Sequence, residues 1–127
     1  MRHCLLAVLL LAGSAAAAMA AAPAAPLQQY DIPPGSRPQT VAIVERNFAP
    51  GTGVPLHIHH GVEITYVIRG DVEVDIQGRA PHVYHAGESF MVPREVPHLA
   101  KNAGSGVASI AVTYVIDRGT PLMVPVK

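Results

Sequence analysis

Hydrophobic and polar residues alternate over short stretches from Val41 onward, and turns containing Gly or Pro separate these stretches. Between residues 72 and 76, Val72, Val74 and Ile76 alternate with two acidic residues, which is typical of a strand with one buried face. The same reasoning predicts strands over residues 41–48, 54–60, 62–69, 81–85, 89–92, 97–100 and 107–116, and an extended tail over 121–126. No segment has a sustained helical period, so the sequence predicts an all-β sandwich or barrel.

Two of these predicted strands are apolar on both faces. In residues 62–69, one face carries Glu63, Thr65 and Val67, and the other carries Ile64, Tyr66 and Ile68. Residues 107–116 are similarly apolar on both sides. A barrel of two layers leaves the outer face of each sheet uncovered, so we expect another element to cover the second apolar face. A homodimer is the favoured cover, and an N-terminal arm folded back on the sheet is the alternative.

The first 39 residues do not follow the strand pattern. Arg2 precedes an apolar run over residues 5–12, and Ala18-Met19-Ala20 offers a cleavage site of small residues. We therefore predict a secretory signal peptide over residues 1–20, and a periplasmic or secreted protein, because the apolar run is too short to span a membrane. A retained N-terminal anchor is the alternative. Residues 21–39 are rich in Ala and Pro and predict an extended arm or linker, which leaves residues 40–127 as one domain.

The charge balance restricts the class of partner. The chain has nine Lys and Arg residues and nine Asp and Glu residues, and loss of Arg2 with the signal peptide would leave eight basic residues. This near-neutral balance argues against nucleic acid or an anionic membrane surface as a partner. The single cysteine, Cys4, would also be lost, so the mature chain would have neither disulfides nor thiolate chemistry.

Three histidines and a glutamate occur within seven residues, from His57 to Glu63. Side chains two positions apart on a strand share a face, so His57 and His59 are expected to project together. Glu63 follows a short bend at Gly61, and His98 offers a further imidazole in a later strand. Imidazole and carboxylate together make a mixed nitrogen and oxygen ligand set for a metal.

The spacing of these residues resembles the two sequence motifs of the cupin superfamily. The first motif matches Gly51, five residues, His57, one residue, His59, three residues, Glu63, six residues and Gly70. The second motif matches Gly87, five residues, Pro93, then His98, and three residues later Asn102. The family usually has glycine where this chain has Glu95. The resemblance covers about half the chain and implies a small jelly-roll barrel.

The resemblance also implies a divalent transition metal (Mn, Fe, Co, Ni, Cu or Zn), with His57, His59, Glu63 and His98 as its ligands. Their alternative role is that of polar residues in an ordinary barrel, but burying so many ionisable groups without a metal would be costly. His60 is the rival ligand; it is expected on the opposite face from His59, as a surface or supporting residue.

Several other polar residues are assigned less specific roles. We expect His82 and His85 at the surface, on opposite faces of their strand. Asn102 is expected to be a turn or strand-end residue, and Tyr66 a core or interface residue. Glu95 is expected to be exposed; its alternative role is a carboxylate at the pocket mouth that moves a proton. The pocket lining is otherwise expected to be apolar, with either Phe90 or Met91 facing inward.

Three classes of function fit these features. Four protein ligands would leave two positions open on a six-coordinate ion, which favours an enzyme acting on a small oxygenated molecule by oxygenase, decarboxylase, isomerase or lyase chemistry. This preference is an analogy at the level of the fold. The alternatives are a non-catalytic module that binds or senses a small ligand and a structural or metal-storage protein. A zinc ion saturated by four ligands would require no catalysis.

Overall fold

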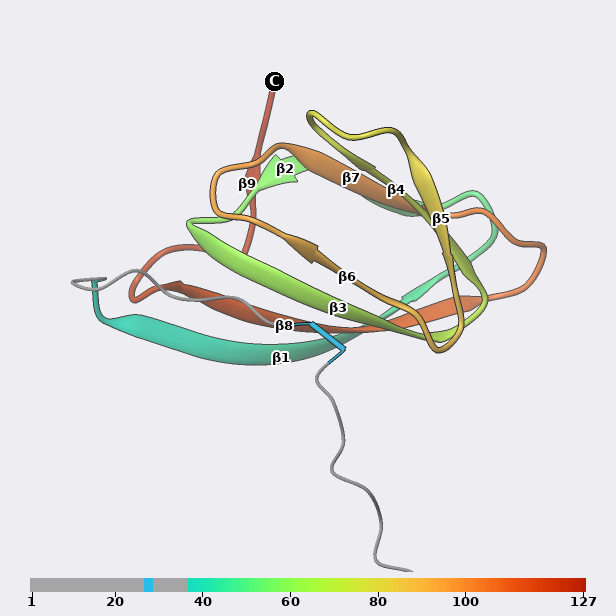
Figure 1. Ribbon diagram of the computed structural model, residues 1–127, viewed down its shortest axis with the longest axis horizontal. Coiled ribbons are helices and arrows are strands. Elements are labelled where there is room, and N and C mark those ends of the chain that lie inside the picture. The colour runs from blue at the N-terminus through green and yellow to red at the C-terminus, as the bar shows by residue number, and fades with distance from the viewer. Residues whose placement is uncertain (1–26, 29–36) are drawn as a thin grey trace, which may run out of the picture.

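The computed structural model describes residues 27–28 and 37–127, which form an all-β fold without a helix (Figure 1). The predicted signal peptide and most of the predicted arm lie outside these residues. The strands are β1 (Gln39–Phe48), β2 (Gly53–Ile58), β3 (Gly61–Arg69), β4 (Asp71–Ile76), β5 (His82–His85), β6 (Ser89–Val92), β7 (His98–Asn102), β8 (Ala108–Asp117) and β9 (Val124–Pro125). Among the described residues there is accordingly no helix long and apolar enough to cross a membrane.

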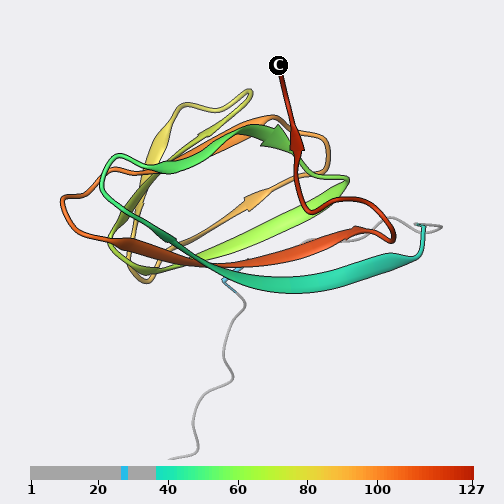
Figure 2. The ribbon, with the colours of Figure 1, turned by 180° about the vertical axis from the view of Figure 1, so that it is seen from behind.

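The strands form two antiparallel sheets that face each other as the layers of a small jelly-roll barrel (Figures 1 and 2). One sheet has the order β1-β8-β3-β6, and the other has the order β5-β4-β7-β2-β9. Sequence neighbours such as β2 and β3 therefore lie in different sheets, and the chain crosses between the layers at the bend over residues 59–60. The prediction of a jelly-roll barrel is confirmed.

The core lies between the two sheets and follows the predicted alternation. In β4, Val72, Val74 and Ile76 are buried, whereas the two acidic residues between them are not. In β8, the even-numbered residues from Ala108 to Ile116 are buried, and Ala111, Thr113 and Val115 are only partly covered. The inward side of β3 carries Glu63, Thr65 and Val67, as expected.

A glycine fixes the close approach of β3 to its neighbour β8. A Cβ atom on Gly61 would lie 2.1 Å from the carbonyl oxygen of Val115, far inside van der Waals contact. Glycine at this position lets β3 pair with β8 from its first residue, with Gly61 opposite Ile116. This pairing sets the register that brings Glu63 opposite Tyr114 on the inner face.

The predicted strands agree with the structure except near their ends. The strand predicted over residues 54–60 ends at Ile58, so His59 and His60 lie in the bend that follows β2. The C-terminal tail is more ordered than predicted, because β9 pairs with His57 and Ile58 of β2. Phe90 is the member of its pair that faces the core. Tyr66, expected in the core or an interface, is 42% exposed and therefore not a core residue of this chain.

Candidate metal centre

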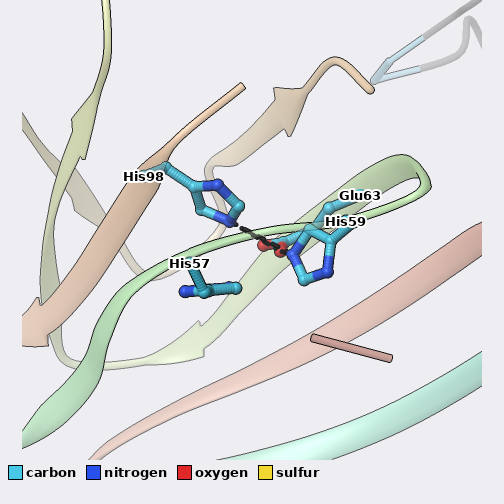
Figure 3. Close-up of side chains that lie close together, drawn as sticks. All are labelled: His57, His59, Glu63 and His98. Atoms are coloured by element: carbon cyan, nitrogen blue, oxygen red, sulfur yellow. Dashed lines mark hydrogen bonds and ion pairs between the residues drawn. The ribbon is translucent and has the colours of Figure 1, made fainter. Parts of the chain in front are cut away.

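The four predicted ligands come together inside the barrel (Figure 3). His57 lies in β2, His59 in the following bend, Glu63 in β3 and His98 in β7, so both sheets contribute. All four residues are at most 5% exposed, and one ligand atom from each lies within 4.8 Å of the others. The register pairs His57 directly with His98, with ring centroids 4.2 Å apart.

The nitrogen and oxygen atoms of three of these residues are in direct contact. The Nε2 atom of His59 lies 2.7 Å from Oε2 of Glu63 and 3.2 Å from Nε2 of His98. The Nε2 atom of His98 lies 3.2 Å from the same Oε2 atom. Adjacent ligands that each lie about 2.1 Å from an octahedral ion are about 3 Å apart. The observed separations match that spacing.

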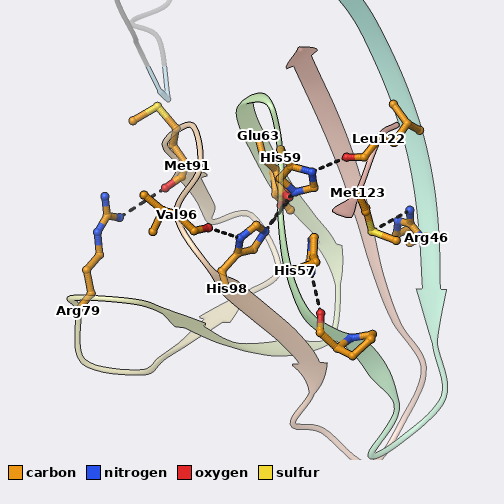
Figure 4. Close-up of polar contacts among 12 residues, drawn as sticks. Arg46, His57, His59, Glu63, Arg79, Met91, Val96, His98, Leu122 and Met123 are labelled. Carbon is orange, nitrogen blue, oxygen red and sulfur yellow. Dashed lines mark hydrogen bonds and ion pairs between the residues drawn. The ribbon is translucent and has the colours of Figure 1, made fainter. Parts of the chain in front are cut away.

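Each imidazole is oriented by a backbone carbonyl on its other nitrogen (Figure 4). The Nδ1 atom of His57 lies 2.7 Å from the carbonyl oxygen of Pro55, and that of His98 lies 2.9 Å from the carbonyl oxygen of Val96. The Nδ1 atom of His59 contacts the carbonyl oxygen of Leu122. A carbonyl oxygen only accepts hydrogen bonds, so each Nδ1 carries a proton and a neutral ring has its lone pair on Nε2. Metal-ligating histidines commonly have such partners.

The meeting point of these atoms therefore favours a cation. With Nδ1 protonated, Nε2 of a neutral His59 or His98 is an acceptor, and the Glu63 carboxylate is also an acceptor. Three acceptors at 2.7 to 3.2 Å repel one another unless protons or a metal ion lie among them. The chemistry of the donor set thus fits a divalent metal, and these four residues form a candidate site for one.

The carboxylate is held in its charged form. Burial raises the pKa of Glu63, but its contacts with His59 and His98 and the hydrogen bond from Thr65 outweigh burial and hold this pKa well below its usual range. The Thr65 hydroxyl donates to Oε1 at 2.6 Å and leaves Oε2 toward the two histidines. Burial lowers the pKa of His57 to about 4, against the opposing effect of its bond to Pro55, so this ring is neutral near pH 7.

A small cavity adjoins three of the four residues, His57, Glu63 and His98. It is lined by Arg46, Val54, His57, Glu63, His98, Ala100, Ile110, Val112, Tyr114 and Met123. The volume open to the centre of a water molecule is about 10 Å³, close to what a single water requires. Burial, together with the negative charge of Glu63, raises the pKa of Tyr114, so its phenol remains protonated. The cavity thus combines apolar side chains with two imidazoles, one carboxylate, one guanidinium and one phenol.

The arrangement of sheets and site agrees with comparison to known proteins. A family model described as a cupin domain matches residues 44–116, which include the four candidate ligands. The chain belongs to the cupin family. Oxalate oxidase GF-2.8 from Triticum aestivum is 35% identical to it over 89 residues, which cover 64% of this chain and 40% of that protein.

Solved structures of other cupins are also similar to this chain. An oxalate oxidase in complex with the substrate analogue glycolate is 33% identical, with a TM-score of 0.59, and the match covers 66% of this chain and 45% of that one. An RmlC-like cupin from Shewanella frigidimarina is 28% identical, with a TM-score of 0.55, over 62% of this chain and 68% of that one. This cupin therefore spans about half the length, or less, of the oxalate oxidases that it matches.

Glu95, which replaces the usual glycine of the second cupin motif, has an unusual backbone conformation. Glu95 has a φ of 60°, and it is the one non-glycine residue with positive φ among those described. Its carboxylate lies 2.7 Å from Nδ1 of His60, and both side chains are partly exposed. Its backbone N–H donates to the carbonyl of His59 at 3.0 Å. Glu95 does not line the cavity, so proton transfer by Glu95 stays a prediction without support from this geometry.

The remaining predicted polar residues lie away from the four ligands. His82 and His85 are both exposed, and His85 pairs with Asp71 at 2.7 Å, a contact that raises its pKa. Asn102 ends β7 and is buried; its amide donates to the carbonyls of Phe48 and Gly106 at 2.9 and 2.6 Å. It is a strand-end residue, as expected.

Three contributors to the site were not predicted from the sequence: Arg46, Tyr114 and the C-terminal segment. The other inward-facing residues of β1 are Ala42, Val44 and Phe48. A charged residue at a position where the alternation predicts an apolar one was the available sequence signal for Arg46. Tyr114 was recognised only as part of an apolar strand. The contact of His59 with the carbonyl of Leu122 could not be predicted from the sequence, because every residue has a backbone carbonyl.

Proposed function

We propose that this cupin is a metal-dependent enzyme that acts on a small oxygenated molecule. The observation that carries the proposal is the set of three imidazoles, each fixed by a carbonyl, that meet one carboxylate beside a cavity. His57, His59, Glu63 and His98 would hold the ion, which is Mn, Fe, Co, Ni, Cu or Zn. When bound, such an ion supplies Lewis acidity, and a redox-active one also supplies electron transfer.

The residues of the chain perform the other tasks that such chemistry needs. The three carbonyls keep the histidine Nε2 lone pairs directed inward, and Thr65 keeps the Glu63 carboxylate in place. The apolar walls limit the access of water, which strengthens electrostatic interactions inside the cavity. Tyr114 keeps its proton near neutral pH and can donate a hydrogen bond to a bound oxygen atom.

The names of the relatives suggest which reactions to test first. Several of them are oxalate oxidases, so oxidation of oxalate or related short acids is the first candidate, followed by decarboxylase, lyase and isomerase reactions. This chain covers less than half of those proteins. Their activity is therefore a hypothesis for this cupin.

A non-catalytic module that binds a small ligand is the second candidate. The observation that favours it is the size of the cavity, which has room for about one water. Oxygen consumption and product formation with oxalate, glycolate and simple phenols separate the two, using protein loaded with redox-active and non-redox metals in turn. Turnover supports the enzyme; absence of turnover with every metal supports the binding module.

Metal binding itself is tested with two histidine variants. Elemental analysis of the protein from its native compartment is expected to give about one transition-metal ion per chain. His59→Ala is expected to abolish this stoichiometric metal, because it removes the nitrogen in contact with both Glu63 and His98. His82→Ala, at an exposed position, is the control and is expected to retain it. Full metal content in the His59 variant would contradict the ligand assignment.

Secretion is part of the proposal and rests on the sequence of residues 1–20. A signal peptide there would deliver the mature chain to the periplasm or the medium. Cell fractionation and N-terminal sequencing test this. A start at Ala21 is expected, whereas an intact N-terminus in the membrane fraction would indicate a retained anchor.

We also propose that the mature cupin is a homodimer. The outer face of the β1-β8-β3-β6 sheet exposes Val41, Ile43, Tyr66 and Ile68, with Val41 and Ile43 66% and 74% exposed. Burial of such a patch stabilises association. The alternative cover is the arm, since the amide of Gln28 donates to Ser89 in β6. Light scattering at micromolar concentration distinguishes them, because a monomer would exclude the dimer.

A further inference from the structure

Arg46 is a charged residue that faces the inside of the barrel without a carboxylate partner among the described residues. It lies in β1 opposite Ile110 of β8, between the inward-facing Val44 and Phe48, and it lines the cavity beside the candidate metal ligands. One terminal nitrogen, Nη2, lies 3.7 Å from the thioether sulfur of Met123 (Figure 4). The Nε atom is buried and has no hydrogen-bond partner among the described residues.

Burying the Arg46 side chain in this way is unfavourable unless a ligand supplies acceptors for its N–H donors. Burying a charged donor without a partner is unfavourable, and a thioether is only a weak acceptor. Arg46 makes no ion pair with any described carboxylate, and Glu63, which lines the same cavity, is already bound by Thr65, His59 and His98. The Arg46 side chain also hydrogen-bonds to the Tyr114 phenol, which is a neutral partner. Among the described residues the guanidinium therefore has only neutral partners, and its Nε atom has none, so an anion in the cavity would balance its charge.

We propose that Arg46 is a substrate-binding residue and that the cavity accepts a short-chain carboxylate. This inference rests on the proposed function, in that the four ligands hold a divalent ion. With that ion in place, its charge and that of Arg46 together outweigh the single carboxylate of Glu63. The cavity is then net positive and favours a small anion over a neutral molecule of the same shape.

The shape of the site favours a carboxylate over a larger anion. The guanidinium is planar, and its parallel N–H donors match the two oxygen atoms of a carboxylate. The cavity is close to the size of one water, so an entering ligand must be small and must displace a mobile group. Met123 is suited to be that group, because its unbranched side chain adapts to its surroundings.

Binding to the metal-loaded protein tests the proposal without requiring turnover. Calorimetric titration compares glycolate with glycolamide, which has the same shape but no charge, and with inorganic phosphate. The wild-type protein is expected to bind glycolate at least 10-fold more tightly than glycolamide or phosphate. Arg46→Gln is expected to weaken glycolate binding by about 10- to 100-fold and to leave glycolamide binding unchanged, because it removes charged hydrogen bonds. Arg69→Gln, at an exposed position, is the charge-matched control.

The possible outcomes separate this inference from the proposed function. Unchanged glycolate binding by Arg46→Gln, with normal metal content, would show that the ion alone binds the acid and would overturn the inference. Equal losses for glycolate and glycolamide would indicate a structural role and would also overturn it, as would tighter binding of phosphate. If Arg46→Gln does not fold, Arg46→Lys replaces it, with an expected loss of several-fold for glycolate only. Failure to find turnover would affect the proposed function but not this binding result.

Discussion

The left-handed backbone at Glu95 gives a quantitative test of the second cupin motif. A residue other than glycine at a φ of 60° costs about 1 kcal/mol relative to glycine, because its Cβ crowds the following carbonyl. The exposed pair that Glu95 makes with His60 at 2.7 Å contributes about 0.2 to 1 kcal/mol in return. These two effects have similar size, so wild-type stability alone does not separate them.

A series of substitutions at this position isolates the backbone contribution. Glu95→Gly, Glu95→Asn and Glu95→Ala all remove the carboxylate that lies 2.7 Å from His60 and 3.9 Å from Arg94, and they differ in how well they tolerate positive φ. We expect Glu95→Gly to be the most stable of the three, Glu95→Asn intermediate and Glu95→Ala the least stable. The difference between the glycine and alanine variants is expected to be about 1 kcal/mol, or about 4 to 8 °C in Tm for a domain of this size.

Urea unfolding of the metal-free protein is the appropriate assay, since bound metal would add its own stabilisation. Each variant is measured at pH 7.5, and the midpoints are compared at constant slope. His60→Ala, which removes the pair without altering residue 95, gives the contribution of that pair separately. If Glu95→Ala is as stable as Glu95→Gly, the backbone at this position is not strained, and positive φ does not explain the glycine of the motif.

Three further predictions concern the residues that support the site. Thr65→Val removes the hydroxyl that donates to Glu63 and is expected to weaken metal affinity by about 10- to 100-fold with the fold intact. Competition with a chelator measures this affinity, and Thr113→Val is the control. The metal-free protein is expected to lose about 2 kcal/mol between pH 7.5 and 5, because unfolded His57 takes up a proton below pH 6.5 whereas the folded residue, with a pKa of about 4, does not. A His57→Gln variant with an unchanged pH slope in urea unfolding would contradict that assignment. Asn102→Asp is expected to lower the free energy of unfolding by about 3 kcal/mol or more in the same assay, because it places a carboxylate oxygen against the carbonyls of Phe48 and Gly106. Unchanged stability would show that these hydrogen bonds are not needed.

The fold could be predicted because its signals are local. In β4, each residue reveals its face by its own polarity, and Gly70 and Gly78 mark the turns on either side with positive φ. In β8, burial alternates from Ile110 to Asp117, although both faces of this strand are apolar in sequence. These signals do not depend on how the sheets are connected. The order of strands in each sheet could not be predicted in this way, because periodicity does not indicate which strands pair; the family resemblance implied only a jelly-roll barrel.

The candidate ligands could be predicted for a different reason. His57, His59 and Glu63 are close in sequence, so their spacing alone suggested that they converge. His59 nevertheless lies outside β2, in the bend, and its inward direction is maintained by the contact of Nδ1 with the carbonyl of Leu122. The alternation rule that placed it beside His57 thus gave the right side chain for an incomplete reason.

The contacts made by the C-terminal segment could not be predicted from the sequence. Leu122 orients His59 through a backbone carbonyl, and Met123 contacts the guanidinium of Arg46 through a thioether. Neither interaction requires a residue type that suggests a metal site or an anion site. Both arise because β9 pairs with β2 and carries the preceding residues across the cavity. The identity of the candidate metal ligands is therefore carried by the motif residues, whereas the orientation of His59 and the placement of Arg46 depend on contacts more than sixty residues apart in the chain.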